Sequence, residues 1–296
     1  MKIVFLGSSQ KKHIADLLGR AGCTCIMLSE EANAVKRKVL NLCRFLSADM
    51  VYSVGGEDYE TCYVYKLARL LGKKVVIHWI GTDVLNAVQN DDGRKRDNSP
   101  LVINLAGSEL LQMELEQIGI CASVVPIVPC NMEFDACPMP SRHAVLSYIP
   151  QNRESFYGME ILKKVAKEFP DIQFHIVSNN GLNDTERLEN VVYEGMLNPK
   201  QMKELYKNCS VLFRYPQHDG LSMMVLEALG MGRTVIYKYP FPYVVTPEGE
   251  TIQEILQTFS MVFSENPKVN QAAAQYVRDS FSVKKQLNRY RKAGVL

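Results

Sequence analysis

Short apolar runs alternate along the chain with longer segments in which apolar residues recur at helical spacing. An alternation of strands and helices is typical of βαβ units that build a parallel sheet. In the first half, the apolar runs predict strands at Lys2–Leu6, Thr24–Leu28, Met50–Val54, Lys74–His78, Leu101–Leu105 and Ser123–Val125. The intervening segments predict helices at His13–Ala21, Ala34–Leu46, Glu60–Leu71 and Glu109–Ile118.

The alternation stops at "PIVPCNMEFDACPMPSRHA" (126–144), where four prolines and no periodicity predict a linker. A second series then begins. Its predicted strands are Ala144–Tyr148, Gln173–Val177, Val191–Glu194, Val211–Arg214 and Thr234–Tyr237. Its predicted helices are Gly158–Glu168, Pro199–Asn208, Leu221–Gly230, Ile252–Ser260 and Asn270–Ala293.

The sequence therefore predicts an α/β protein of two Rossmann-like, doubly wound domains joined by the linker. A length of 296 residues is comfortable for two such domains. Ligands of doubly wound sheets bind outside the carboxyl ends of the strands, so we expect the site in the cleft between the domains.

Composition excludes several classes of protein. The net charge is only +2, with 34 Lys and Arg against 32 Asp and Glu spread evenly over both halves, so nucleic acid is not an expected partner. The eight cysteines form no C-x-x-C pair, which speaks against structural zinc and a redox dithiol. No signal peptide and no membrane-spanning run is recognisable, so we expect a cytoplasmic protein.

Two acids bracket an apolar helix in "HDGLSMMVLEALGMGRTVI" (218–236). Asp219 follows a predicted strand, where an ordinary helix N-cap is the alternative interpretation. Glu227 lies among apolar residues and has no such explanation. Eight helical residues separate the two acids by roughly 12 Å, a spacing that suits a ligand with polar groups at both ends, such as a nucleotide sugar.

The backbone between the acids predicts a place for the diphosphate. The N–H groups of Gly220, Leu221 and Ser222 stand where the helix is expected to begin. A helix N-terminus presents unpaired N–H groups and positive potential, and it is therefore a ready anion site.

At these residues the sequence resembles a known family. "NVVYEGMLNPKQMKELYKNCSVLFRYPQHDGLSMMVLEALGMGRTVI" (190–236) is similar to the donor-binding core of the retaining glycosyltransferases of family 4, which have the two-Rossmann GT-B fold. The family signature is a Glu, seven residues and a second Glu, and Asp219 and Glu227 occupy these two positions. Further similarity extends over most of residues 100–290, including "VRDSFSVKKQLNRY" (277–290), which resembles the family's closing helix.

The resemblance implies domains and chemistry. Residues 1–130 would bind the acceptor, residues 131–278 the nucleotide sugar, and residues 279–296 would pack back on the first domain. Glu227 would bind the ribose hydroxyls, and Asp219 would act as a catalytic residue at the donor sugar. It further implies transfer with retention of configuration, no metal and no cofactor, a UDP- or GDP-linked donor, and a glycan or lipid-linked acceptor.

The sequence departs from the family at the diphosphate. Many members have an Arg and, five residues later, Lys-Gly at the start of the second domain. Here "SYIPQNRESFYGMEI" (147–161) has Tyr157 in place of the Lys, before Gly158. Because a leaving diphosphate needs positive charge when no metal is bound, Arg153 and Arg214 are the candidate replacements. The acidic turn "NDDG" (90–93) is interpreted as a solvated loop.

The first domain supplies candidates for the acceptor side. The resemblance implies that His78, at a strand end, is a catalytic residue facing the donor sugar, and an ordinary buried ring is the alternative. Asp83 orients the acceptor or caps a following helix. Gly7, Ser8 and Gly81 end strands on the same side, where tight turns that need small residues explain them equally well.

A membrane surface is the last partner considered. Lys11, Lys12, Lys36, Arg37 and Lys38 lie on predicted helices of the first domain, where many family members with lipid acceptors attach to anionic bilayers. A solvated basic face is the alternative interpretation.

We therefore expect a metal-independent retaining glycosyltransferase that acts in polysaccharide, glycolipid or glycan assembly. A non-catalytic homologue that binds a nucleotide sugar or a partner protein is the alternative, because Tyr157 replaces the expected lysine. A nucleotide-sugar epimerase would need more acid–base groups than His78 and Asp219 supply.

Overall fold

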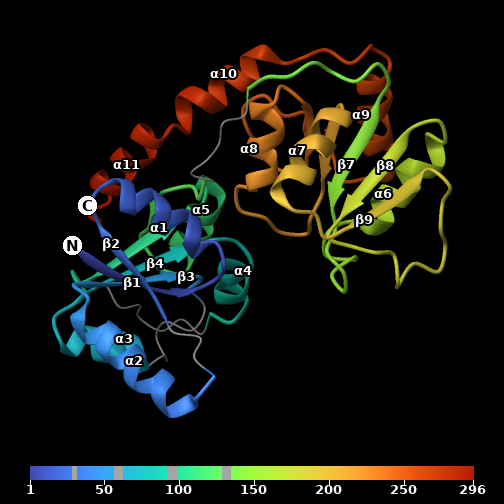
Figure 1. Ribbon diagram of the computed structural model, residues 1–296. Helices are drawn as coiled ribbons and strands as arrows, with labels where there is room; N and C mark the ends of the chain where they lie inside the picture. Colours follow the sequence, from blue (N-terminus) through green and yellow to red (C-terminus); the bar gives the residue numbers. More distant parts are fainter. Residues whose placement is uncertain (29–31, 57–62, 92–98, 129–134) are drawn as a thin grey trace. The chain divides into compact units, whose positions relative to one another are not determined.

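The structure is a computed structural model that describes residues 1–28, 32–56, 63–91, 99–128 and 135–296. The chain divides into two compact units (Figure 1). Unit 1 consists of Met1–Met132, His218–Leu221 and Phe281–Leu296, and unit 2 of Glu133–Gln217 and Ser222–Ser280. Unit 1 is thus built from three separate segments of the chain.

Unit 1 contains a six-stranded sheet with the order β2-β1-β3-β4-β5-β6, all parallel. Its strands are β1 (Lys2–Gly7), β2 (Thr24–Met27), β3 (Met50–Val54), β4 (Lys74–Trp79), β5 (Val102–Ala106) and β6 (Ser123–Val124). Its described helices are α1 (Lys11–Arg20), α2 (Ala34–Ser47), α3 (Tyr63–Leu70), α4 (Thr82–Gln89), α5 (Glu109–Gln117) and α11 (Val283–Lys292).

Both faces of this sheet are covered, as β1 illustrates. Val4 packs into a core with residues of α2 to α5, such as Phe45 and Leu111. Its neighbours Ile3 and Phe5 point to the opposite face, and both are fully buried. On that face α1 packs against α11 (Figure 1). Near-continuous burial along the strands is the pattern expected of a doubly wound parallel sheet.

Unit 2 contains a five-stranded parallel sheet with the order β11-β10-β7-β8-β9. Its strands are β7 (Ala144–Tyr148), β8 (Gln173–Val177), β9 (Val191–Gly195), β10 (Val211–Arg214) and β11 (Thr234–Tyr237). Its helices are α6 (Met159–Glu168), α7 (Pro199–Asn208), α8 (Met223–Gly230), α9 (Ile252–Phe263) and α10 (Gln271–Ser280).

Helices cover both faces of this second sheet as well. α6 and α9 contact each other and share one core, which includes Leu162, Phe174 and Phe259. α8 packs against α10, β10 and β11, and α7 packs against β7. The predicted fold class, two Rossmann-like α/β domains, is confirmed. The predicted cleft between them stays a prediction.

Two predicted helices differ from the structure, and one helix was not predicted. The prediction omitted α4, which begins at Thr82 after the turn that Asp83 organises. The helix expected from Leu221 begins only at Met223. The last predicted helix is two helices, α10 and α11, interrupted at Phe281 and Ser282. The start predicted at Glu60 lies outside the described residues, which resume at Tyr63.

The described part of the predicted linker, residues 126–128 and 135–143, contains no helix or strand. Among the described helices, none has the length and apolar character needed to cross a membrane.

Candidate functional site

The carboxyl edge of the unit 2 sheet has a switch point between β7 and β10, where the strand order reverses. Crevices at such points are the usual ligand sites of doubly wound sheets. Tyr148 ends β7 and Arg214 ends β10. Because Leu146 pairs with Leu212, Tyr148 and Arg214 lie on neighbouring strands at the same level, on either side of the switch point.

A cluster of arginine and aromatic side chains stands at this edge. The guanidinium carbon of Arg214 lies 5.4 Å from the ring centre of Tyr157 and 5.7 Å from that of Tyr148. Arg153 lies 5.3 Å from the Tyr157 ring and 4.6 Å from the Phe156 ring. Two guanidinium groups therefore flank Tyr157, the residue that replaces the expected lysine, and both contribute cation–π attraction to it. Arg214 is buried, whereas Arg153 is exposed.

The backbone at Gly158 explains the position of Tyr157. Gly158 precedes α6 with a φ of +80°, a left-handed conformation that favours glycine. A Cβ at this position would lie 2.6 Å from the carbonyl oxygen of Tyr215, in the segment that follows β10. The tight approach brings the start of α6 to the end of β10, and hence Tyr157 to Arg214.

Glu227 lies on α8 and is held by a tyrosine. The hydroxyl of Tyr206, on α7, donates a hydrogen bond of 2.7 Å to Oε2 of Glu227. Burial raises the pKa of Glu227 to about 7, although the Tyr206 hydrogen bond acts in the opposite direction. The pKa of Tyr206 is raised by its own burial and by Glu227, while the charge of Arg214 acts to lower it.

Tyr206 is therefore bonded to the acid, and it lies within reach of the charge of Arg214. Sequence reasoning missed it, and nothing in the local pattern distinguishes it from a tyrosine that only packs. Its hydrogen bond to Glu227 joins α7 to α8, and such a tertiary contact cannot be read from the local sequence.

Asp219 is placed differently from the prediction. Residues 219–222 are not helical, and the N-cap of α8 is Ser222, whose side chain makes no capping bond. The N-cap interpretation of Asp219 is therefore wrong, and the 12 Å estimate along a continuous helix does not apply. Gly220 and Leu221 precede the helix. Asp219 belongs to unit 1 and Glu227 to unit 2.

The segment His218–Leu221 is held within unit 1. His218 is buried, and its Nε2 lies 2.8 Å from Oε2 of Glu114 on α5. Gly220 lies against the carbonyl oxygen of Ile80 and the side chain of Leu111, with no room for a side chain of its own.

Gly7 and Ser8 lie at the switch point of unit 1, between β1 and β3. Gly7 has a φ of +84°, and a Cβ there would lie 2.0 Å from the carbonyl oxygen of Val54. The N–H of Ser8 donates to that same oxygen at 2.9 Å. The alternative interpretation of Gly7, a turn that needs a small residue, thus has a direct structural cause.

His78 lies near the end of β4, as predicted, and it is part of the core. It is fully buried, with Nδ1 at 2.8 Å from the Tyr52 hydroxyl and Nε2 at 2.7 Å from the Val125 carbonyl oxygen. Burial lowers its pKa to about 4. Both ring nitrogens are bonded inside unit 1 and neither is exposed, so the geometry favours the ordinary buried ring.

Asp83 has a structural role in its own turn. Its carboxylate accepts hydrogen bonds from the backbone N–H groups of Ile80, Gly81 and Gly56, at 2.7 to 3.2 Å. Burial raises its pKa, and the backbone bonds act against the rise. The carboxylate therefore fixes the turn before α4, whose N-cap is Gly81. Asp83 therefore stabilises the turn and is not itself the cap, and the acceptor-orienting role stays a prediction.

The described residues contain no group of three or more His, Cys, Asp or Glu side chains arranged to hold a metal ion. The acidic turn at 90–93 lies partly outside the described residues, which stop at Asp91 and resume at Ser99.

Comparison with protein-family models and with curated proteins gives no match. Solved structures do match. The chain is similar to the apo form of WaaB, a lipopolysaccharide outer core galactosyltransferase, with a TM-score of 0.67, 16% identity and 99% of each chain covered. Sucrose-phosphate synthase from Thermosynechococcus elongatus matches with a TM-score of 0.73, 11% identity and 99% of each chain covered.

The chain has the GT-B fold. WaaG, a glycosyltransferase involved in lipopolysaccharide biosynthesis, agrees with this assignment, at a TM-score of 0.61 and 10% identity over 100% of this chain and 99% of that one. At these identities the likeness establishes the GT-B architecture, which the sequence resemblance had implied. It does not by itself assign the reaction.

Proposed function

We propose that the protein is a glycosyltransferase whose unit 2 binds a nucleotide sugar and whose unit 1 binds the acceptor. The GT-B fold supports the class of enzyme. The observation that carries the proposal is the group formed by Glu227, Tyr206 and Arg214 beside the switch point of unit 2. A carboxyl that accepts from hydroxyls and a buried cation nearby are complementary to a ribose linked to a diphosphate.

In the proposed reaction, the bond between the anomeric carbon and the diphosphate oxygen breaks. The acceptor oxygen bonds to the same face of that carbon, and its proton leaves with the diphosphate. Arg214 and Arg153 stabilise the charge that develops on the leaving oxygens, without a metal ion. Glu227 holds the ribose hydroxyls, and Asp219 stabilises the positive charge that develops on the sugar.

A uridine nucleotide is the first donor to test. Structures of TarM from S. aureus and of the pneumococcal O-GlcNAc transferase GtfA, both in complex with UDP, match 82% of this chain with TM-scores of 0.60 and 0.58. This chain spans only 55% and 56% of those two proteins. The proposed acceptor is a hydroxyl of a glycan or of a lipid-linked glycan.

The test is thermal unfolding of the wild type, Glu227→Ala and Glu204→Ala with UDP, GDP, ADP, CMP or dTDP, each with EDTA and with magnesium. Glu204 is a matched control because it is an exposed acid on α7. One nucleotide at 100 times its dissociation constant should stabilise the wild type by about 2.7 kcal/mol. We expect that stabilisation, in EDTA, in the wild type and the control but not in Glu227→Ala.

Two results would count against the proposal. Stabilisation of Glu227→Ala equal to that of the wild type would remove Glu227 from the site. Failure of every nucleotide, with and without magnesium, would remove donor binding altogether.

A non-catalytic homologue that binds nucleotide sugar is the second candidate. Two observations favour it: Tyr157, which both arginines contact, stands where a lysine is expected, and His78 is enclosed in the core. Release of nucleotide from a nucleotide sugar, by transfer or by slow hydrolysis, separates the candidates. Binding of a nucleotide sugar without any release of its nucleotide would favour the non-catalytic homologue.

We also propose peripheral contact with an anionic membrane through α2. Its apolar residues Val35, Val39, Leu42 and Leu46 recur at helical spacing and are 72%, 55%, 50% and 52% exposed. Lys36, Arg37 and Lys38 add positive charge on the same helix. An exposed apolar stripe beside basic residues is typical of helices that lie in a membrane interface.

Co-sedimentation with anionic and with neutral vesicles tests the contact. We expect binding to anionic vesicles that weakens with salt and is lost in Leu42→Glu. Leu182→Glu is the control, because Leu182 is 76% exposed and lies in unit 2. Equal sedimentation of both variants would exclude α2 as the contact.

A further inference from the structure

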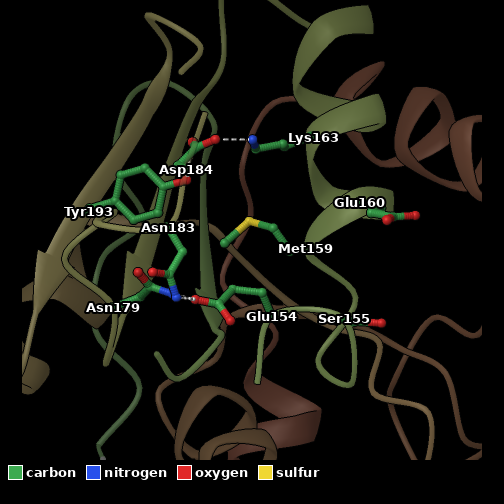
Figure 2. A pocket seen from close by; sticks show the side chains of 9 residues that line it. All are labelled: Glu154, Ser155, Met159, Glu160, Lys163, Asn179, Asn183, Asp184 and Tyr193. Atoms are coloured by element: carbon green, nitrogen blue, oxygen red, sulfur yellow. Dashed lines mark hydrogen bonds and ion pairs between the residues drawn. The ribbon is translucent and has the colours of Figure 1, made fainter. Parts of the chain in front are cut away.

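Unit 2 contains a polar pocket that the proposed donor site does not use. It has a volume of about 330 Å³ and lies between the start of α6 and the loop that follows β8 (Figure 2). Pockets that hold small ligands begin at about 300 Å³, so this one accommodates a molecule of one or two sugar rings.

The pocket lies on the face of the sheet opposite the helices that carry Tyr206 and Glu227. Side chains alternate between faces along a strand, and β9 separates Tyr193 from Glu194 in this way. Tyr193 lines the pocket and packs against the core that α6 and α9 share. Glu194 points to the other face and bonds His175 at 2.7 Å. α7 and α8, which carry Tyr206 and Glu227, contribute no residue to the α6–α9 core.

At one end of the pocket lies Lys163, whose positive charge is neutralised by an ion pair with Asp184. Lys163 bonds the carboxylate of Asp184, which also accepts from the Tyr193 hydroxyl (Figure 2). These two bonds help lower the pKa of Asp184 against the effect of its burial. Lys163 also donates to the Glu186 carbonyl oxygen at 3.0 Å. The lysine charge is therefore committed within the protein.

The other end presents acceptors that are fixed in place. Oε1 of Glu154 accepts from the amides of Asn179 and Asn183, both at 3.2 Å, and from the N–H of Asn152 at 3.1 Å. Asn179 is buried and is itself held, because its Oδ1 accepts from the N–H of Gly181 at 2.8 Å. Hydrogen bonds of these kinds lower the pKa of Glu154 against burial, so its carboxylate is ionised at neutral pH.

The charge of the lining decides the class of ligand. The pocket is lined by three carboxylates, those of Glu154, Glu160 and Asp184, and by a single lysine, so its lining carries a net charge of −2. Phosphates and sugar acids are therefore repelled. Since the neighbouring donors of Glu154 converge on Oε1, its Oε2 remains to accept from a ligand, as does Oδ1 of Asn183.

We propose that this pocket binds a neutral sugar residue of a glycan, through hydroxyl groups that donate to Glu154 and Asn183. Met159 supplies an apolar patch for a ring face between the two polar ends (Figure 2). Glu154 directly follows Arg153 in the chain, and Arg153 belongs to the cluster of arginine and aromatic side chains at the donor site. A glycan held here is recognised beside the donor site, without occupying it.

Saturation-transfer difference NMR with methyl glycosides of glucose, galactose and N-acetylglucosamine tests the proposal, with glucuronic acid as the anionic counter-probe. We expect at least one neutral glycoside to bind and glucuronic acid to bind at least about tenfold more weakly. Loss of a hydrogen bond to a charged group should weaken binding by about tenfold or more in Glu154→Gln. Asn183→Ala, at an exposed position, should weaken it in the same direction.

Three controls keep this test separate from that of the donor site. Glu168→Gln, at the exposed end of α6, should bind as the wild type does. Glycoside binding should persist in Glu227→Ala and in the presence of UDP. Three results would each overturn the pocket assignment. The first is that no neutral glycoside binds, and the second is that Glu154→Gln and Asn183→Ala both bind the glycoside as tightly as the wild type does. The third is that UDP displaces the bound glycoside. The first two of these outcomes do not depend on whether a nucleotide binds.

Discussion

The burial of His78 makes the stability of unit 1 depend on pH in a predictable direction. Its pKa is about 4 in the folded protein, against an ordinary value of 6.5. Between these two values the unfolded chain binds a proton at His78 and the folded chain does not. The free energy of unfolding therefore rises with pH across this window. The contribution of His78 to it is lost as the pH falls from 6.5 towards 4.

The size of the effect follows from the two pKa values. Each pH unit of difference corresponds to about 1.4 kcal/mol, so the full window of 2.5 units gives roughly 3 kcal/mol. Above pH 6.5 His78 adds no further dependence, because it is neutral in both states. Since domains are stabilised by only about 5–15 kcal/mol, a loss of this size is a large part of the total.

Urea unfolding of the wild type and of His78→Gln at a series of pH values measures the effect. Trp79 is the single tryptophan, is buried on β4 next to His78, and therefore reports on unit 1 by its fluorescence. Glutamine keeps a donor for the Val125 carbonyl oxygen and an acceptor for Tyr52 but does not titrate. We expect the wild type to lose stability relative to this variant as the pH falls below 6.5.

His13→Gln, on α1, serves as the matched control and should follow the wild type. If the wild type and His78→Gln lose stability in parallel between pH 7 and pH 4, then His78 is not held neutral by its surroundings. The core assignment of this residue would then be refuted.

Two further predictions concern other positions. Glu227 should make stability depend on pH in the opposite direction, because its pKa of about 7 in the folded protein exceeds the ordinary value of 4.5. As the pH rises from 4.5 to 7, the wild type should lose up to roughly 3 kcal/mol of stability relative to Glu227→Gln, measured by thermal unfolding. A difference between the two proteins that does not change with pH would refute this prediction. Gly7→Ala should destabilise unit 1 by about 1–3 kcal/mol more than Gly22→Ala in the Trp79 assay, because both glycines have a φ of +84° but only Gly7 meets a backbone oxygen, that of Val54. Equal losses in the two variants would show that the close approach is relieved.

The sequence predicted the strands well, because their signal is local. Continuous apolar runs bounded by turn residues marked β3, β7 and β8 with the bounds that the structure has. α4 was missed because its start depends on the carboxylate of Asp83, which binds backbone groups on two different loops. The start of α8 was misplaced because Asp219 has the sequence features of a helix N-cap, whereas the N-cap in the structure is Ser222.

The candidate site was predictable in part. The pair of acids was visible because Glu227 stands out among apolar residues. Its partner Tyr206 and the contacts of Tyr157 with two arginines were not visible, because they join α7 to α8 and the start of α6 to β10. The two interpretations of His78 could not be separated, because position at a strand end does not reveal what the ring nitrogens contact, here the Tyr52 hydroxyl and the carbonyl oxygen of Val125.

The three-segment construction of unit 1 has a consequence for synthesis of the protein. Its sheet is complete in sequence by Val124, but Tyr290, whose hydroxyl lies 3.4 Å from that of Tyr52, is translated far later. At about 5–20 residues per second, that delay is on the order of 10–30 s. During this time the face of the sheet that α11 covers has emerged from the ribosome without its helix. Unit 2 can therefore finish folding before the unit that was started first, and the nascent chain is most exposed to chaperones and to aggregation on the face around Tyr52.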